Sequence, residues 1–350
     1  MAEPTRVRFG IIGCGGAAVP VAEAMAASGV AELAAVYDKQ PALAQDLGGR
    51  FLAVVHDSLE AMLADPSLAA VYIAVPHNQL APLATRALQA GKHALVEKPM
   101  AARVADADAL VALADSRNLA LGVFYELRHS AANIRARALL QAGAIGTVIG
   151  VHSQTLIDKP QSYWQLGTAS RTRSPWRGSM AEAGGGVVLM NTSHALDTIR
   201  WLTGLEVVRV AGEVGTLVAA GVEVEDTASA SLRFDNGAIG SLFVGAHLAG
   251  ASRDEQVTIF GTEGQLRLPY PYGADPLKVF FRREWAGLAP NEWHTLPDAQ
   301  APIYAGAVDD FARAVQRGVP APTSGRDARQ VLAIVLGLYQ SSAEHAVVSI

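Results

Sequence analysis

The chain has 350 residues, of which half are apolar and 17% are charged, and this composition predicts a globular protein with two domains. It carries 28 Lys and Arg against 33 Asp and Glu, without a basic block, which excludes nucleic acid as an expected partner. A single cysteine excludes an intrachain disulfide and a cysteine-based metal cluster, and we expect no bound metal. The sequence has no apolar signal core and no apolar run of membrane length, so we expect no membrane contact and a cytoplasmic location.

The first predicted elements are a strand at residues 7–12, a glycine turn and an alanine-rich helix. The turn has the spacing G-x-G-x-x-A, which provides a tight turn, bare backbone for a pyrophosphate and a small residue for close packing. A phosphate at this place would accept hydrogen bonds from amides at the helix N-terminus. The expected dinucleotide contacts in the turn are Gly13, Cys14, Gly15, Gly16, Ala17 and Ala18.

A second apolar strand, at residues 31–38, ends in Asp38, where dinucleotide-binding proteins place an acid about 20 residues after the glycines. Its carboxylate can accept hydrogen bonds from the ribose hydroxyls of NAD, whereas the 2′-phosphate of NADP would meet like charge. The neighbouring Lys39 is either a solvated loop residue or a group that offsets this repulsion. NAD is therefore the expected cofactor, and use of NADP stays open.

After Asp38, helices alternate with short apolar strands as far as residue 124, a pattern typical of a parallel sheet covered on both faces. The strand at residues 69–75 ends in Val75, Pro76 and His77. Ligands bind at this edge of such sheets. These three residues are expected either to pack near the nicotinamide half of the cofactor or only to stop the strand.

The strand at residues 92–96 ends in Glu97, Lys98 and Pro99. The carboxyl ends of parallel strands share one edge, so these residues are expected beside the glycine turn. Folding alone does not require a lysine there. We interpret Glu97 and Lys98 as functional, against the alternative of a surface ion pair that contributes little.

From residue 125 the pattern changes to a helix at 131–141, a strand at 147–154 and an irregular stretch at 155–183. A stretch of this length inside a domain is usually functional or disordered. Its aromatic and arginine side chains suit a lid over a hydroxyl-rich ligand, although the tryptophans can equally anchor a loop. These side chains are Tyr163, Trp164, Arg171, Arg173, Trp176 and Arg177.

A glycine run at residues 184–186 then opens a predicted helix that reaches residue 202. In an α-helix, Asn191, His194 and Asp197 share a face, and Met190 lies one turn before His194. Such a polar row is costly to bury unless each group has a partner or a task. We interpret it as catalytic, while a satisfied core histidine stays an alternative.

The rest of the chain predicts an open, mainly antiparallel sheet followed by helices at residues 304–317 and 326–344. Because helices cover only one face, we expect the other face to mediate self-association into a homodimer or homotetramer. The predicted strands lie at residues 207–218, 228–234, 238–246, 256–260, 265–268 and 277–281. The expected division is a nucleotide-binding domain at 1–124 and a substrate and oligomerisation domain at 125–350.

This ordered set of motifs resembles the glucose-fructose oxidoreductase, inositol dehydrogenase and MocA family. The resemblance rests on the glycine turn, Asp38, the strand end at Pro76, the sequence Ala-Gly-Lys-His-Ala-Leu-Val-Glu-Lys-Pro at 90–99 and the glycine run. It covers nearly the whole chain, including Glu225-Asp226-Thr227 and the turn at 261–264. It implies an α/β protein with an N-terminal Rossmann sheet and a C-terminal α+β domain.

The resemblance also implies an activity, namely NAD(P)-dependent hydride transfer from a ring hydroxyl of a sugar, sugar derivative or cyclitol. The family's catalytic lysine falls on Lys98 and its catalytic histidine on His194. The histidine would take the hydroxyl proton and the lysine would stabilise the alkoxide, while Asn191 would position the hydroxyl. The predicted substrate contacts are Lys98, Arg128, Trp164, Trp176, Arg177, Asn191 and His194.

Two positions depart from the family's pattern. Met190 replaces an aspartate that many members have, and Leu80 replaces a histidine that often follows the strand-end proline. These departures keep a non-catalytic NAD(P)-binding sugar sensor open as an alternative. An NAD-dependent glycoside hydrolase on the same scaffold is a second alternative.

Overall fold

The computed structural model describes residues 6–166, 174–247, 249, 253–270, 272, 275–297 and 302–350. The chain divides into two compact units, and each consists of three segments. The first unit holds residues 1–126, 165–184 and 304–332, and the second holds residues 127–164, 185–303 and 333–350. Within the described residues, no helix combines the length and the hydropathy needed to cross a bilayer.

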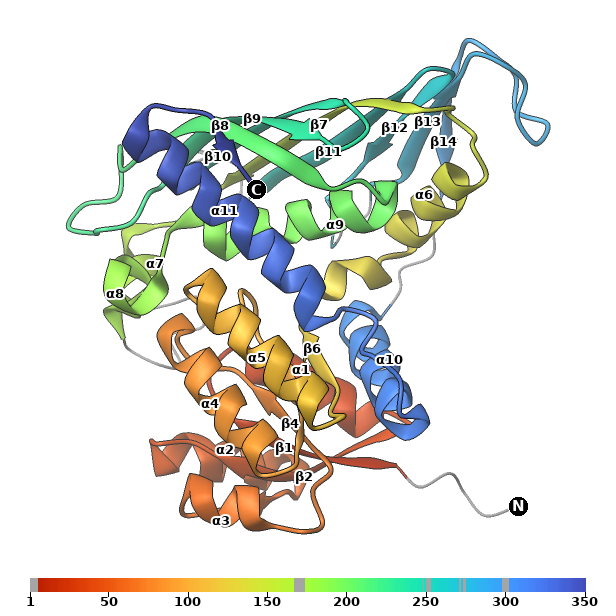
Figure 1. Ribbon diagram of the computed structural model, residues 1–350. Helices are drawn as coiled ribbons and strands as arrows, with labels where there is room; N and C mark the ends of the chain where they lie inside the picture. The colour runs from red at the N-terminus through yellow and green to blue at the C-terminus, as the bar shows by residue number, and fades with distance from the viewer. Residues whose placement is uncertain are drawn as a thin grey trace. The chain divides into compact units, whose positions relative to one another are not determined.

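The first unit is built on a six-stranded sheet with the order β3-β2-β1-β4-β5-β6, in which all neighbours are parallel (Figure 1). Its central strands are buried along nearly their whole length because helices cover both faces. The strands are β1 (Val7–Ile12), β2 (Ala31–Tyr37), β3 (Val54–Val55), β4 (Ala70–Ile73), β5 (His93–Val96) and β6 (Leu121–Val123).

Local sequence signals mark the start of two helices of this unit. Ser58 caps one helix by accepting a hydrogen bond from the Ala61 N–H, and Pro41 occupies the first turn of another. The helices are α1 (Ala18–Ala27), α2 (Pro41–Phe51), α3 (Leu59–Ala64), α4 (His77–Gln89), α5 (Val104–Ser116), η2 (Pro175–Gly178), α8 (Met180–Ala183) and α10 (Ile303–Arg317).

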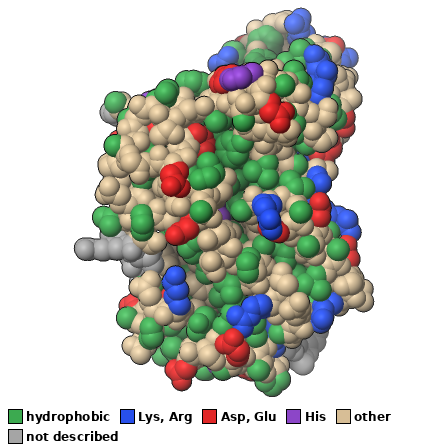
Figure 2. Space-filling model, turned by 60° about the vertical axis from the view of Figure 1, so that its left-hand side comes forward, with side chains coloured by type: hydrophobic (Ala, Val, Ile, Leu, Met, Phe, Trp, Pro, Cys, Tyr) green, Lys and Arg blue, Asp and Glu red, His purple; other side chains and the backbone are tan. Residues whose placement is uncertain are grey.

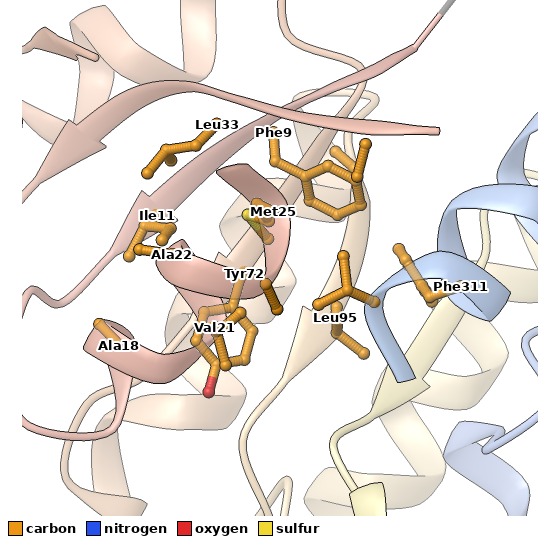
Figure 3. Close-up of a cluster of buried hydrophobic side chains, with 14 of the residues drawn as sticks. Phe9, Ile11, Ala18, Val21, Ala22, Met25, Leu33, Tyr72, Leu95 and Phe311 are labelled. Atoms are coloured by element: carbon orange, nitrogen blue, oxygen red, sulfur yellow. The ribbon is translucent and has the colours of Figure 1, made fainter. Parts of the chain in front are cut away.

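One apolar cluster fills the space between the sheet, α1 and α10 (Figure 3). Phe9 of β1 and Phe311 of α10 lie with their ring centroids 6.0 Å apart. The ring of Tyr72 in β4 packs edge-to-face on the ring of Phe124, with the two ring centroids 5.5 Å apart. A segment from the end of the chain therefore completes the core of the N-terminal sheet, since Phe311 is 2% exposed.

The second unit contains a nine-stranded sheet with the order β14-β13-β12-β11-β7-β10-β9-β8-β15. The pair β7 and β10 is parallel and the other neighbours are antiparallel, which confirms the expected open, mainly antiparallel sheet. The strands are β7 (Val148–Ile157), β8 (Val207–Gly215), β9 (Thr227–Phe234), β10 (Ile239–Gly245), β11 (Arg253–Gly261), β12 (Gly264–Leu268), β13 (Leu277–Phe281), β14 (Trp293–Leu296) and β15 (Val348–Ser349).

Helices pack against one face of this sheet (Figure 1). Buried and exposed residues alternate along β9 and β10, as expected for a sheet with one covered face. The helices with residues in this unit are η1 (Glu126–His129), α6 (Ala131–Gln141), α7 (Gln161–Leu166), the π-helical turn η3 (Val188–Thr192), α9 (Ser193–Thr203) and α11 (Gly325–Glu344). On the face of the molecule drawn in Figure 2, acidic and basic side chains are interspersed.

Two expectations about local structure are wrong. Residues 155–183 are not one irregular stretch, because β7 continues to Ile157 and three short helices follow among the described residues. The helix after the glycine run is not α-helical from its start, because residues 188–192 form the π-helical turn η3. Sequence analysis also missed strands β3, β14 and β15, of which β3 and β15 have two residues each and are too short to show a periodic pattern.

Candidate active site

The glycine turn between β1 and α1 is held by contacts that only glycine allows. Gly13 has a φ of +90°, and its N–H donates to the Tyr37 carbonyl at 2.9 Å. A Cβ at Gly13 would lie 2.2 Å from the Ala74 carbonyl oxygen and 2.8 Å from a methyl group of Val75. Three neighbouring parallel strands therefore meet closely at this turn, which makes glycine a structural requirement.

Asp38 follows β2 and turns its carboxylate back to the glycine turn. Oδ2 accepts a hydrogen bond from the Cys14 N–H at 2.7 Å, and Oδ1 accepts one from the Gln40 N–H at 2.8 Å. Both bonds fix the orientation of the carboxylate, whose remaining lone pairs can accept from ribose hydroxyls. Lys39 is exposed, and Cys14 is buried with its Sγ 3.7 Å from the Tyr37 carbonyl oxygen.

The N-terminus of α1 is suited to an anion. Its N-cap, Ala17, has no side-chain hydrogen bond to the helix, and the first turn contains no acidic residue. The first amides of a helix have no intrahelical acceptor, and the helix dipole favours negative charge there. The residues present fit a dinucleotide pyrophosphate, with Gly15, Gly16 and Ala18 in the same turn.

His77 lies at the carboxyl end of β4, directly after the N-cap Pro76 of α4. Its imidazole is 5% exposed, and Nδ1 donates to the Ala183 carbonyl at 2.7 Å. Its ring meets the Trp176 ring edge-to-face at 4.7 Å. Burial, together with the positive charges of Lys98 and Arg177, lowers the pKa of His77 to about 3, so the imidazole is neutral. In the structure, this side chain contacts residues 176 and 183.

Glu97 and Lys98 follow β5 at the same sheet edge, and the Lys98–Pro99 peptide bond is cis. The carboxylate of Glu97 accepts a hydrogen bond from the buried Tyr72 hydroxyl. Burial raises the pKa of Glu97 above its usual value, although the Lys98 charge and the Tyr72 hydroxyl oppose this shift. This geometry is not that of a surface ion pair. Sequence analysis missed Tyr72, whose only signal was a hydroxyl inside an apolar strand.

In the second unit, η3 and α9 carry Met190, Asn191 and His194. The i→i+5 bonding of a π turn places more than four residues in each turn, so the simple three-residue spacing of an α-helix does not hold there. Asn191 Oδ1 is buried without a hydrogen-bond partner among the described residues, and His194 is half-buried. Such π turns occur frequently at functional sites.

The last residue of the polar row along this helix, Asp197, has a structural partner. Asp197 is 1% exposed, and it accepts hydrogen bonds from Arg128 Nε at 2.8 Å and Nη2 at 2.5 Å. The guanidinium is itself 6% exposed, so the two groups form a buried bidentate ion pair. Asp197 and Arg128 therefore stabilise the packing of η1 on α9, and the substrate contact expected of Arg128 stays a prediction.

The glycine run is explained by close packing and by a cap that sequence analysis missed. A Cβ at Gly186 would lie 1.8 Å from the Glu225 carbonyl oxygen, and one at Gly185 would lie 2.2 Å from the Tyr339 hydroxyl. The carboxylate of Glu225 accepts hydrogen bonds from the N–H groups of Gly186 and Val188 at 2.6 and 2.9 Å, and from the Tyr339 hydroxyl at 2.9 Å. Burial raises the pKa of Glu225, which these hydrogen bonds oppose.

The expected aromatic lid residues are divided between the two units. Trp164 is 2% exposed and packs edge-to-face on Tyr163, which fits the anchoring alternative. The Tyr163 hydroxyl donates to Met190 Sδ at 3.4 Å, so Tyr163 contacts the methionine that replaces the aspartate of many family members. Trp176 belongs to the first unit, where the Arg177 guanidinium lies 4.5 Å from its ring centroid. Arg171 and Arg173 lie outside the described residues.

Two family models match the chain, and together they cover more than half of it. The model described as "Oxidoreductase family, NAD-binding Rossmann fold" matches residues 7–125. The model described as "GFO/IDH/MocA C-terminal domain" matches residues 134–267. The first match contains the glycine turn, Asp38, His77 and Lys98, and the second contains His194.

The known proteins that are similar to the chain include a dehydrogenase and a reductase. The chain is 33% identical over 237 residues to 1-carboxy-3-chloro-3,4-dihydroxycyclo hexa-1,5-diene dehydrogenase of Comamonas testosteroni, covering 66% of the chain and 56% of that relative, just over half its length. It is 29% identical to 1,5-anhydro-D-fructose reductase of Ensifer adhaerens, covering 82% of the chain and 81% of that protein. The structure of GenD2 from gentamicin A biosynthesis in complex with NAD has a TM-score of 0.83 and 27% identity, covering 100% of the chain and 98% of GenD2.

Proposed function

The chain belongs to the GFO/IDH/MocA family of NAD-binding oxidoreductases, and from this premise we propose that it transfers hydride between NAD and a ring hydroxyl of a sugar, sugar derivative or cyclitol. The names of its relatives support this substrate class, because they include an anhydro-sugar reductase and a dehydrogenase of a dihydroxylated ring. The solved complex with NAD supports the choice of cofactor.

The observation that carries the proposal is the pairing of Asp38 with the glycine turn. The Cys14 N–H fixes the carboxylate beside the N-terminus of α1, whose amides are not capped by a side chain. A ribose and a pyrophosphate are the groups that such a carboxylate and such amides bind. When bound, NAD accepts the hydride from the alcohol carbon.

The residues that we assign to the reaction are Lys98, His194 and Asn191. His194 takes the proton of the substrate hydroxyl, since imidazole is a base suited to near-neutral pH. Lys98 stabilises the negative charge that develops on the same oxygen. Asn191, with its buried Oδ1, accepts a hydrogen bond from a substrate hydroxyl and orients the ring. Trp176 and Arg177 complete the proposed substrate contacts.

The test of this mechanism is NADH absorbance after the protein and NAD are mixed with a panel of aldoses, anhydrosugars, inositols and glycosides. One substrate class should give a signal that falls about 10²- to 10⁴-fold in Lys98→Ala and His194→Ala. Lys278→Ala, on the exposed side of β13, is the matched lysine control, and His152→Ala on β7 is the matched histidine control. Wild-type turnover by His194→Ala, or silence across the panel with NADH binding intact, would contradict the proposal.

We further propose that the uncovered face of the nine-stranded sheet joins copies of the chain into a homodimer or homotetramer. Strand register places Phe260, Gly150 and Ile239 side by side on neighbouring strands. Phe243 lies four residues after Ile239 in β10, so it is on the same face of the sheet. The three large side chains are 38%, 53% and 43% exposed for Phe260, Ile239 and Phe243, respectively. Burial of this apolar surface against a second copy is favourable.

The mass measured by light scattering tests the assembly. The wild-type protein should be dimeric or tetrameric, and Phe243→Glu should shift it towards the monomer because burying the charge is costly. Leu52→Glu is the control, since Leu52 is 94% exposed and lies in the first unit. A monomeric wild-type protein at micromolar concentration would contradict this proposal.

A further inference from the structure

His77 joins two segments of the first unit that are far apart in sequence. Its Nδ1 donates to the Ala183 carbonyl, 106 residues away, and its ring lies against Trp176. We call residues 175–183, which comprise η2 and α8, the docked segment. Because His77 is the first residue of α4, these contacts attach the docked segment at the carboxyl edge of the Rossmann sheet.

The candidate catalytic lysine lies close enough to His77 for its charge to affect the pKa of the imidazole. Lys98 of the turn after β5 and Arg177 of the docked segment both act on its pKa through their positive charges, and the Ala183 carbonyl acts in the opposite direction. Two cations next to a buried imidazole disfavour its protonated form. The neutral ring can donate one hydrogen bond from Nδ1, and the Ala183 carbonyl accepts it.

We propose that His77 is a positioning residue that holds the docked segment on the cofactor edge of the sheet and thereby presents Trp176 and Arg177 beside bound NAD(H). The inference rests on NAD binding at this edge, and it deepens the proposed function without requiring the sugar substrate. His77 acts through the backbone at Ala183 and the ring of Trp176.

The docked segment consists of two short helices, and α8 packs against α4. Its helices are one turn long, with the Ala183 N–H donating to Ser179 and the Gly184 N–H donating to Met180. Helices this short are not stable by themselves and depend on tertiary contacts. The buried hydrogen bond and the ring contact at His77 are therefore tertiary contacts that help to order Trp176 and Arg177.

The experiment measures the affinity for NADH and the rate of NADH dissociation by nicotinamide fluorescence in two His77 variants and one control variant. His77→Phe keeps a ring against Trp176 but removes the donor to Ala183, and His77→Asn keeps a donor but removes the ring. One buried hydrogen bond contributes about 0.5–1.5 kcal/mol, so we expect about a three- to tenfold rise in Kd for His77→Phe. The change should appear mainly in the dissociation rate, and His77→Asn should recover part of it.

His93→Phe is the matched control. His93 lies at the opposite end of the same sheet, in β5, and its Nδ1 accepts a hydrogen bond from the Ala120 N–H at 2.9 Å. This variant loses a comparable backbone contact in the same unit, so it should lower Tm without changing the Kd for NADH. Equal Tm losses in His77→Phe and His93→Phe, with NADH affinity unchanged in both, would overturn the proposal.

A second readout applies even if His77→Phe folds poorly. In the wild-type protein, NADH should slow hydrogen exchange at the amides of Ala183 and Gly184, whereas in Trp176→Leu this protection should fall about three- to tenfold. Exchange at these amides that is indifferent to NADH in the wild-type protein would overturn the proposal. Because NADH binding is measured without substrate, a silent sugar panel would contradict the dehydrogenase mechanism and leave this test intact.

Discussion

The chain contains two glycine-rich helix starts, and they serve opposite purposes. At Gly13 the following helix, α1, has neither a side-chain cap nor an acidic residue in its first turn. At Gly186 the amides of the following turn are occupied by the carboxylate of Glu225. The first start can bind an anion from solution, whereas the second already contains one. Glu225, which lies 39 positions after Gly186 along the chain, therefore makes the second helix start a packed structural site, whereas the first remains a possible ligand site.

The largest effect that tests this comparison is expected from Glu225→Ala. It leaves the N–H groups of Gly186 and Val188 and the Tyr339 hydroxyl without their buried acceptor. We expect a loss of about 3 kcal/mol in the free energy of unfolding, measured by urea denaturation, with NADH affinity retained. Glu223→Ala, an exposed glutamate two residues earlier, is the control. A loss no larger than that of the control would show that Glu225 is not the cap.

An intermediate effect is expected at Asp226. The pKa of Asp226 is lowered, whereas the pKa of the neighbouring Glu225 is raised. Burial alone raises the pKa of Asp226, but N–H groups of Ala219, Leu217 and Val218 together hold it below its usual value. A lowered pKa contributes stability above pH 3.8, which is lost as the pH falls through the folded-state pKa.

Asp226→Asn should therefore lose about 2 kcal/mol at pH 7 and much less at pH 3. Urea denaturation of both proteins across this range measures the difference. A variant that loses the same amount at both pH values would show that the ionised carboxylate is not what stabilises this turn.

The smallest effect is expected from a substitution that gives α1 a carboxylate cap like the one that Glu225 provides after Gly186. Ala17→Asp places a carboxylate at the N-cap of α1, where it competes with the pyrophosphate for the same amides. We expect NADH to bind about tenfold more weakly while Tm stays level or rises. Ala17→Asn caps the helix without the charge and should weaken NADH less. Unchanged affinity in Ala17→Asp would contradict an anion site at this helix.

The sequence predicted the parallel sheet of the first unit well because the signals for its strands and helices are local. A strand, a glycine turn, a helix and an acid after the next strand fix the backbone through contacts between neighbouring elements, as the bonds of Gly13 and Asp38 show. The alternating strands of the large sheet were equally readable, since period-two burial appears directly in the residues. The short strands and the short helices of residues 155–183 carry too few residues for any period.

The sequence by itself determined the family and the two sheets, because these depend on spacing and periodicity, and it predicts which residues bind the cofactor. Tertiary structure alone decided which polar residues have structural partners. Asp197 pairs with Arg128, Glu97 with Tyr72, and His77 with Ala183. These partners lie 25 to 106 positions apart, and a buried polar group is satisfied by whatever the fold places within hydrogen-bond distance. Spacing along the chain contains no record of that distance.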